Sequence, residues 1–248
     1  MVVRKSGREL ALMREAGRIV AVTQASVLER IKPGVTTAEL DALAYETVTK
    51  LGAVPSFLGY RGYPASLCVS VNEELVHGIP GPRALREGDI VSLDFGAIHK
   101  GYQGDAAVTV GVGQIGREAQ ELIETTKGAL EEAIDRCRRG GYLGDVSWAI
   151  QSYAESRGYS VVRQYVGHGI GRKMHEDPQI PNYGSPGRGL LLKPGMTFAL
   201  EPMVNVGTYL TRVLEDDWTV VTDDLQLSAH FEHTVAITDG EPEVLTRL

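Results

Sequence analysis

Two apolar segments of the sequence carry an acid where a buried strand is expected. The segment GDIVSLDFGA (88–97) has Asp94 near its centre, and a second apolar run, AAVTV, follows Asp105. An ionised carboxylate that is buried without a partner costs several kcal/mol. The fold must therefore bring counter-charges to these acids, and no other feature of the sequence constrains it more.

A matching pair of acids occurs in the second half of the chain. Alignment of LREGDIVSLD (85–94) with LKPGMTFALE (192–201) places Asp94 on Glu201. Glu232 precedes HTVAIT in the same way that Asp105 precedes AAVTV. We interpret these matches as an internal duplication, with halves at about 1–112 and 113–248.

Two pairs of amphipathic helices accompany these strands. Apolar residues at helical spacing predict helices over about 6–31, 36–51, 119–137 and 145–158, and the first two begin with the capping-box residues Ser6 and Thr36. Glycines that end helices also repeat, since Gly52 aligns with Gly158. We predict an α/β (α+β) fold in one catalytic domain, 1–248, in which helices flank a mixed or antiparallel sheet with pseudo-twofold symmetry.

The composition narrows the choice of partners. The net charge is −7 and no basic run is longer than Arg138-Arg139, which argues against nucleic acid or anionic lipid as a ligand. No apolar run approaches the roughly 20 residues of a membrane helix, and the N-terminus lacks a signal-peptide core. Two cysteines are too few for a disulfide framework. We expect a cytoplasmic protein that acts on small molecules or peptides.

The repeated acids predict a metal site. Asp94, Asp105, Glu201 and Glu232 supply up to four negative charges, and basic residues are scarce in their strands, so two divalent cations would neutralise them. Carboxylates with an occasional imidazole suit Mn, Fe, Co or Zn in a paired site. The imidazole candidate is His168, between two glycines in YVGHGIGRKMHEDP. That segment lacks the Lys-Ser/Thr of a phosphate loop and the second histidine of a zincin, and the chain has no Gly-x-Ser-x-Gly elbow.

Four motifs resemble the type I methionine aminopeptidases. They are LDFGAIHKGYQGDAAVTV, YVGHGIGRKMHEDP, FALEPMV and SAHFEHT, and the resemblance extends over nearly the whole chain. It implies the pita-bread fold, which has an internal pseudo-twofold axis. It also implies removal of the initiator methionine from nascent proteins and peptides with a small second residue, through a water that bridges two divalent metal ions.

The resemblance also implies residue roles. Asp94 and Asp105 would bind one metal, His168 and Glu201 the other, with Asp105 and Glu232 bridging. Glu201 would be the general base, and two histidines, His77 and His175, would contact the substrate and stabilise its oxyanion. The methionine pocket would be formed by Phe57, Tyr60, Tyr63, Cys68, Met174 and Trp218.

Some features depart from the family pattern or stay open. His230 stands where a glutamine is expected, Phe57 where many family members have a smaller residue, and Met174 where many have an aromatic one. We interpret His99, His230 and His233 as structural or exposed. Asn72 and Ser228 are candidates for a monovalent-cation site.

Two alternative functions share this scaffold. A proline dipeptidase or aminopeptidase P would share the metal ligands but usually carries a further N-terminal domain. A catalytically silent binding protein would lose metal ligands, whereas all five are present in this sequence. We expect a monomer; the metal and a transient contact with the ribosome stay open.

Overall fold

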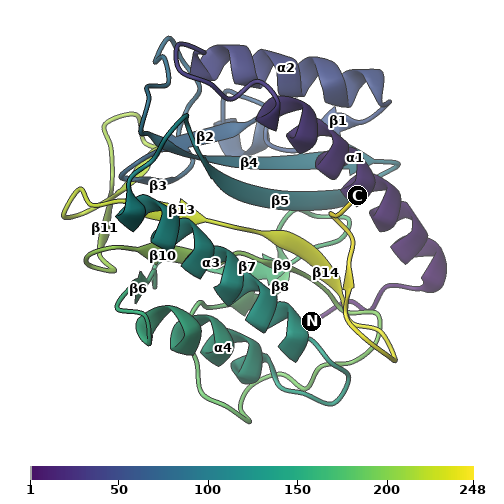
Figure 1. The fold of residues 1–248 in the computed structure, drawn as a ribbon. Helices are drawn as coiled ribbons and strands as arrows, with labels where there is room; N and C mark the ends of the chain where they lie inside the picture. Colours follow the sequence, from purple (N-terminus) through teal and green to yellow (C-terminus); the bar gives the residue numbers. More distant parts are fainter. Residues whose placement is uncertain (1) are drawn as a thin grey trace.

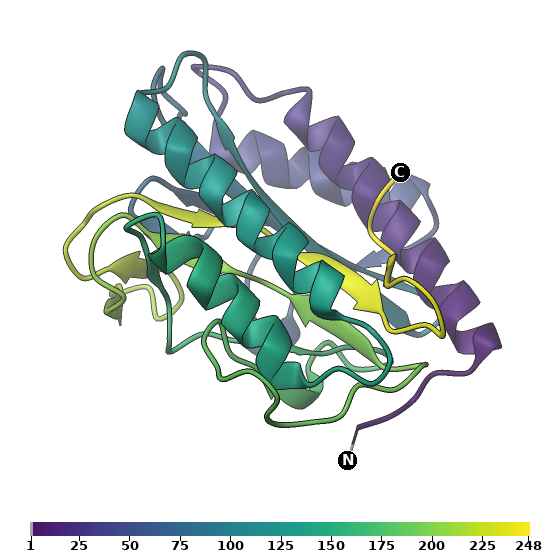
Figure 2. The same ribbon diagram turned by 60° about the horizontal axis from the view of Figure 1, so that its bottom comes forward.

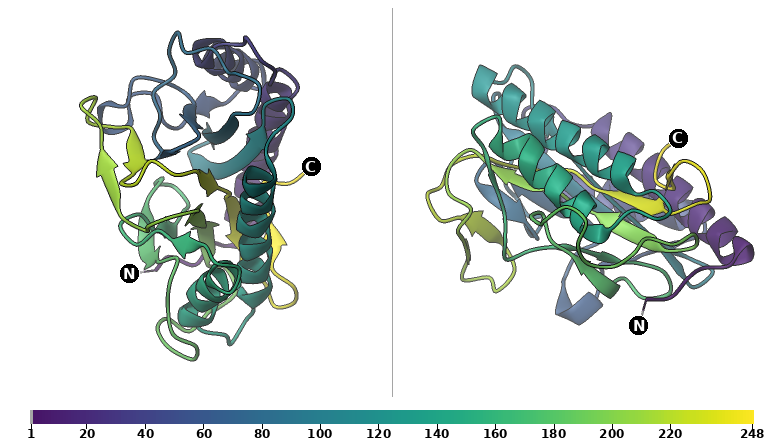
Figure 3. Two further views of the ribbon diagram at one scale, coloured as in Figure 1. Left: turned by 60° about the vertical axis from the view of Figure 1, so that its left-hand side comes forward. Right: turned by 90° about the horizontal axis from the view of Figure 1, so that it is seen from below.

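Two helix pairs lie along one side of the strands (Figure 1). The computed structural model describes residues 2–248, so residue 1 of the predicted domain lies outside the described residues. Helices α1 and α3 run alongside each other, with α2 and α4 outside them (Figure 2), and the views in Figure 3 place the strands behind this helical layer. The helices are α1 (Gly7–Leu28), α2 (Thr37–Lys50), α3 (Arg117–Arg136) and α4 (Leu143–Glu155).

Both predicted capping boxes are present. The Glu9 carboxylate accepts the Ser6 backbone N–H at 2.8 Å, and Glu39 does the same for Thr36 at 2.7 Å. The fourth helix begins at Leu143, two residues earlier than predicted. Asp145 is inside its first turn because its carboxylate accepts the backbone N–H of Tyr142 at 2.9 Å.

The first half contains a long antiparallel hairpin. Strands β4 (Ile90–His99) and β5 (Tyr102–Gly111) pair along their whole length, with Asp94 opposite Ala107 and Asp105 opposite Gly96. Asp105 therefore lies inside its strand, whereas the sequence suggested that it starts one. The pairing of residues 102–104 with 97–99 extends the strand toward its N-terminus. Strands β1 (Val54–Pro55) and β2 (Cys68–Val71) pair with β4.

Three further antiparallel groups of strands are built mainly from the second half, with one strand of the first half in the third group. The largest places β9 (Thr197–Leu200) between β14 (His233–Ala236) and β7 (Gly167–Gly169), with β15 (Glu243–Val244) and β8 (Glu176–Ile180) outside them. A second joins β13 (Ser228–His230), β10 (Met203–Asn205) and β6 (Ser160–Val161). The third joins β11 (Thr211–Val213), β12 (Val220–Thr222) and β3 (Glu74–Val76). A 3-10 turn, η1, spans Tyr60–Gly62.

The two halves meet where the acids lie. The Glu232 backbone N–H donates to the Ala107 carbonyl at 2.8 Å, and the Ala107 N–H donates to the Glu232 carbonyl at 3.3 Å. The Thr234 hydroxyl donates to the Asp105 carbonyl at 2.8 Å and accepts the Asp105 N–H at 2.9 Å. These contacts hold β5 beside the segment that joins β13 to β14.

Strand alternation separates the apolar core from the acids. Leu93 and Phe95 are fully buried in the cluster that includes Leu40 of α2. Because side chains alternate along a strand, Asp94 faces the opposite side, away from the helices. Within residues 2–248, no helix is both long and apolar enough to cross a membrane.

Candidate metal and peptide site

Three groups that could hold a metal converge on the strand face opposite the helices. Ligand atoms of Asp105, His168 and Glu232 all lie within 4.8 Å of one another, and all three side chains are buried. Glu201 joins them, since its Oε1 lies 3.5 Å from His168 Nε2. Asp94 is the neighbour of these groups on β4 and lines the same pocket. The five residues lie in or next to five different strands, so only the folded chain assembles them.

Local sequence places each group. Glu201 follows β9 directly, and the pairing of Leu200 with His233 puts it beside Glu232. His168 pairs with Ala199 on the other side of β9. The glycines flanking His168 are required for this approach, because a Cβ on Gly169 would lie 2.1 Å from the Asp177 carbonyl oxygen. A Cβ on Gly167 would lie 2.6 Å from the Ala199 carbonyl oxygen, as the sequence predicted.

Burial and mutual repulsion raise the pKa values of the four acids. Burial raises the pKa of Asp94 to about 7. Burial, and then the charge of Asp94, raises the pKa of Asp105 well above its usual range. Burial followed by repulsion from neighbouring acids does the same to the pKa of Glu201 and of Glu232. Four carboxyl groups in this position cannot all ionise without a counter-charge.

The imidazoles of the site are held neutral. Burial, and then the nearby His175, lowers the pKa of His168 to about 3. The same two causes lower the pKa of His77 to about 4. A neutral imidazole keeps one free lone pair, which is what a metal ligand needs.

These groups fit a divalent metal. Among residues 2–248, the buried oxygens Asp94 Oδ1, Asp105 Oδ1 and Glu232 Oε1 have no hydrogen-bond partner. Buried carboxylate oxygens without partners are costly, and cations would satisfy them. Carboxylate oxygens with an imidazole nitrogen form the donor set that first-row transition metals accept.

A single pocket of about 150 Å³ is lined by every metal-ligand, catalytic and methionine-pocket residue predicted from the sequence. The metal-ligand candidates form one end of it. The remaining lining residues are Phe57, Tyr60, Arg61, Tyr63, Cys68, His77, Met174, His175 and Trp218. Burial raises the pKa of the Cys68 thiol well above its usual range, so this sulfur is uncharged, and the charged side chain on this wall is that of Arg61. The pocket therefore joins an apolar, sulfur-lined wall to an acidic cluster.

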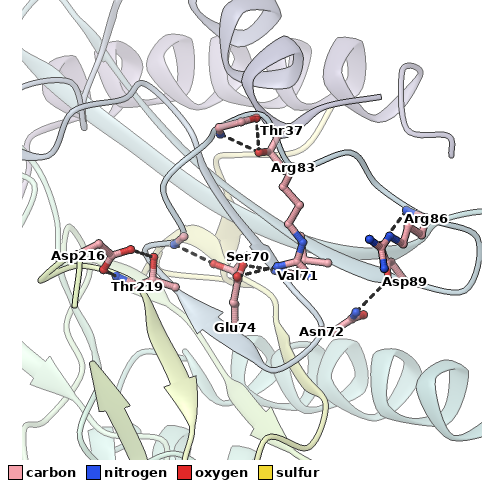
Figure 4. Close-up of polar contacts among 12 residues, drawn as sticks. Thr37, Ser70, Val71, Asn72, Glu74, Arg83, Arg86, Asp89, Asp216 and Thr219 are labelled. Atoms are coloured by element: carbon pink, nitrogen blue, oxygen red, sulfur yellow. Dashed lines mark hydrogen bonds and ion pairs between the residues drawn. The ribbon is translucent and has the colours of Figure 1, made fainter. Parts of the chain in front are cut away.

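Hydrogen bonds from the loops fix the apolar wall. The Tyr63 hydroxyl donates to the carbonyl of Gly78, the residue after His77, at 2.9 Å. The ring centroids of Tyr63 and Trp218 are 5.1 Å apart, and those of His77 and Trp218 are 6.2 Å apart. The Asp216 carboxylate accepts the backbone N–H groups of Trp218 and Thr219 and the Thr219 hydroxyl (Figure 4).

The segment that leads to His77 is also anchored. The Ser70 hydroxyl accepts the Gly78 backbone N–H at 3.1 Å, and Glu74 accepts both the Val71 N–H and the Arg83 guanidinium at 2.8 Å (Figure 4). His77 itself has a positive φ of 61°, which is uncommon for a residue with a side chain. This conformation turns its ring toward the pocket.

At the mouth of the pocket, His175 is paired with Tyr60. The Tyr60 hydroxyl lies 2.8 Å from His175 Nδ1, and the two rings stack with centroids 5.5 Å apart. Burial, and then the Arg61 guanidinium, lowers the pKa of His175. When Tyr60 donates to Nδ1 of the neutral ring, the ring proton is on Nε2. His175 can then donate a hydrogen bond to a substrate through Nε2.

The chain is similar in sequence to known metallopeptidases. Residues 11–239 match the model of metallopeptidase family M24. The chain belongs to metallopeptidase family M24. It is 54% identical over 247 residues to the methionine aminopeptidase of Clostridium acetobutylicum, covering 99% of each chain. It is 53% identical over 248 residues to methionine aminopeptidase 1 of Bacillus subtilis, covering 100% of each chain.

Solved structures confirm the predicted fold of this M24 chain. The crystal structure of the Thermotoga maritima methionine aminopeptidase superposes with a TM-score of 0.99 and 49% identity, covering 100% of both chains. The prolidase of Pyrococcus furiosus superposes with a TM-score of 0.81, but it is 22% identical and the M24 chain covers 66% of its length. This second likeness shows the fold alone.

The sequence missed one lining residue of the M24 site and left a neighbour without a role. Arg61 lies at the pocket mouth between Tyr60 and Gly62, and its positive φ of 50° has no sequence signal in a non-glycine residue. His230 is 1% exposed, which excludes the exposed alternative for it. Its Nε2 lies 3.9 Å from Glu201 Oε2.

The monovalent-cation site stays a prediction. The Asn72 side chain donates to Asp89 at 2.9 Å and accepts the Ile90 backbone N–H at 3.0 Å (Figure 4). The Ser228 hydroxyl donates to Asn205 Oδ1 at 2.8 Å. The Ser228 backbone N–H donates to the Asn72 carbonyl, so these two residues are adjacent.

Proposed function

We propose that this M24 chain is a methionine aminopeptidase, a metal-dependent hydrolase that releases the N-terminal methionine of nascent proteins and peptides. The observation that carries the proposal is one pocket that joins a mainly apolar, sulfur-lined wall to a buried acidic cluster. An unbranched thioether fits the wall, because aromatic rings and soft side chains pack well around sulfur. The scissile bond would then lie against the acids.

The proposed ligands are the five residues of the acidic cluster. Asp94 and Asp105 would hold one divalent metal, His168 and Glu201 a second, and Asp105 and Glu232 would serve both. Bound there, the ions would neutralise the acids and lower the pKa of water for attack at neutral pH. Co, Mn, Fe and Zn all suit this donor set, and cellular supply decides among them.

The chain's own residues would do the rest of the chemistry. Glu201 is our candidate for the base that takes the proton of the attacking water. His175, with its proton on Nε2, would donate to the carbonyl oxygen as negative charge develops there. His77 lies beside Trp218, with ring centroids 6.2 Å apart, and would contact the substrate backbone beyond the methionine.

The proposed specificity follows from these positions. The apolar wall would receive methionine, while the free N-terminal amine would lie at the acidic cluster, which excludes acylated and internal peptides. The second residue of the substrate would lie beside His77 and must therefore be small. An X-Pro peptidase is the alternative that shares this fold, and a test must distinguish the two.

The domain organisation also stands as a proposal. We propose that residues 1–248 form one catalytic domain of two pseudo-equivalent halves, about 1–112 and 113–248. The support is that each half supplies one helix pair, one antiparallel strand pair and two of the four acids. A cytoplasmic location, a monomeric state and transient ribosome contact stay predictions.

The test is a competition among peptides, read as kcat/KM. Met-Ala, Met-Gly and Met-Ser peptides should be cut, and Met-Lys or Met-Trp peptides should be slower by at least about tenfold, ~1.4 kcal/mol of discrimination. Norleucine, which copies methionine without its sulfur, should replace it better than β-branched valine. Fast cleavage of Met-Lys or formyl-Met peptides, or a preference for X-Pro peptides, would overturn the assignment.

A further inference from the structure

His230 is a buried imidazole that the roles above leave unused. It ends β13, is 1% exposed, and neither ring nitrogen has a hydrogen-bond partner within residues 2–248. A buried polar group without a partner destabilises the fold. A core position that needed only bulk would be better filled by an apolar side chain.

The backbone of His230 is held firmly. Its N–H donates to the Thr109 hydroxyl at 2.8 Å, and its carbonyl accepts from that hydroxyl at 2.8 Å. It also pairs with Met203 on β10. Met203 lies two residues after Glu201, and Glu232 lies two residues after His230. These pairings fix where the imidazole lies relative to the acidic cluster.

The nearest acid that the imidazole faces is Glu201. His230 Nε2 lies 3.9 Å from Glu201 Oε2, while Oε1 of the same carboxylate lies 3.5 Å from His168 Nε2. The two oxygens of Glu201 thus face two different imidazoles. The His168 side belongs to the metal-ligand cluster, and the His230 side does not.

The imidazole can donate to this oxygen. An imidazole ring has at least one N–H in either protonation state, so His230 has a proton to donate. A distance of 3.9 Å exceeds a hydrogen bond by about 1 Å, which a small rotation of either side chain removes. Hydrogen bonds in active sites often tighten in this way when the substrate binds.

We propose that His230 is a positioning residue for Glu201, donating its Nε2–H to Oε2 so that Oε1 stays directed toward the metal-ligand cluster. The inference rests on the proposed role of Glu201. A donor on one oxygen of a carboxylate makes the two oxygens unequal and limits rotation of the group. Oε1 of Glu201 would then bind the metal and take the proton of the attacking water, while Oε2 would accept the hydrogen bond from His230.

The test compares His230→Leu, which lacks a donor, with His230→Gln, which keeps one, in the full chain. We expect His230→Leu to weaken Co(II) affinity in titration calorimetry about tenfold, to alter the visible Co(II) absorption spectrum, and to lower kcat about tenfold with KM within about twofold. His230→Gln should stay within about threefold of wild type in all of these. His99→Leu, at the end of β4, is the matched control and should leave the Co(II) spectrum unchanged.

A second background separates positioning from a structural effect. In Glu201→Ala, no oxygen remains for His230 to orient, so adding His230→Leu should change Co(II) affinity by less than about twofold. The same tenfold loss in both backgrounds, or no loss in the single variant, would overturn the proposal. If His230→Leu does not fold, His230→Phe, which keeps a ring but also lacks a donor, replaces it with the same expectations. Methionine release by wild type tests the proposed function separately, because the Co(II) titrations need no turnover.

Discussion

The metal-free protein should become less stable as the pH rises through neutrality. The cause is the acidic cluster, in which burial raises the pKa of Asp94 from 3.8 to about 7 and raises the pKa of Asp105, Glu201 and Glu232 further above their usual range. Without a cation, the fold keeps these groups protonated, whereas the unfolded chain releases their protons. For Asp94 alone, the difference between the two states corresponds to roughly 4 kcal/mol once it is ionised.

The direction of the pH effect follows from the count of bound protons. Between the unfolded and folded pKa values the folded protein binds more protons, so the free energy of unfolding falls as pH rises. The buried imidazoles act in the opposite sense, because the pKa of His168 is lowered to about 3 and that of His77 to about 4. Their effect ends near pH 6.5, where the unfolded histidines also become neutral. Above that pH the acids alone determine the trend.

The size of the pH effect can be estimated for one proton that the folded protein keeps and the unfolded chain releases. Each proton that the fold retains lowers the free energy of unfolding by about 1.4 kcal/mol per pH unit. A domain of this size changes its Tm by about 2–4 °C per kcal/mol. Calorimetry of the chelated protein above pH 6.5 should therefore show Tm falling by roughly 3–6 °C for each pH unit over which one proton is retained.

Two controls sharpen the experiment. Saturating Mn(II) or Co(II) should raise Tm, and by more at pH 8.5 than at pH 6.5, because the ions bind the ionised acids. Asp94→Asn, which keeps the shape of the side chain, should reduce the slope of the metal-free protein. A metal-free Tm that is flat or rises above pH 6.5 would show that the acids are not buried together, and the reasoning would be refuted.

Two substitutions test the proposed catalytic groups. Glu201→Gln should lower kcat for a Met-Ala peptide by at least about 100-fold, because an amide cannot take the proton of water; metal content must be measured alongside, and activity within a few-fold of wild type would show that another group is the base. Tyr60→Phe keeps the ring stacked on His175 but loses the 2.8 Å hydrogen bond. We expect kcat to fall about fivefold, ~1 kcal/mol, with little change in KM; an effect on KM alone would place Tyr60 in binding rather than in orienting His175.

The sequence predicted the elements that follow from local patterns. Both capping boxes, the hairpin strands and the glycines around His168 depend on residues close together in the chain, and all are present. The four acids could also be predicted as a site, because burying an acid in an apolar strand is costly and therefore indicates a function. The resemblance then brought His77 and the apolar wall into the same prediction.

Some features that the sequence did not predict depend on local backbone geometry, and another depends on contacts between distant residues. Helix α4 begins early because Asp145 caps Tyr142, and β5 begins early because residues 97–99 are available to pair with it. Arg61 lines the pocket with a positive φ, a conformation that a sequence pattern predicts for glycine but not for arginine. His230 faces Glu201 only because β10 and β13 pair in one register.

Methionine release with and without metal tests the central claim most directly. The protein is treated exhaustively with chelator, shown to be metal-free by elemental analysis, and incubated with a Met-Ala-Ser peptide while free methionine is measured by mass spectrometry. We predict no release from the metal-free protein and recovery when Mn(II), Fe(II), Co(II) or Zn(II) is added back. Full turnover by the metal-free protein, or no methionine release with any of these ions, would contradict the account.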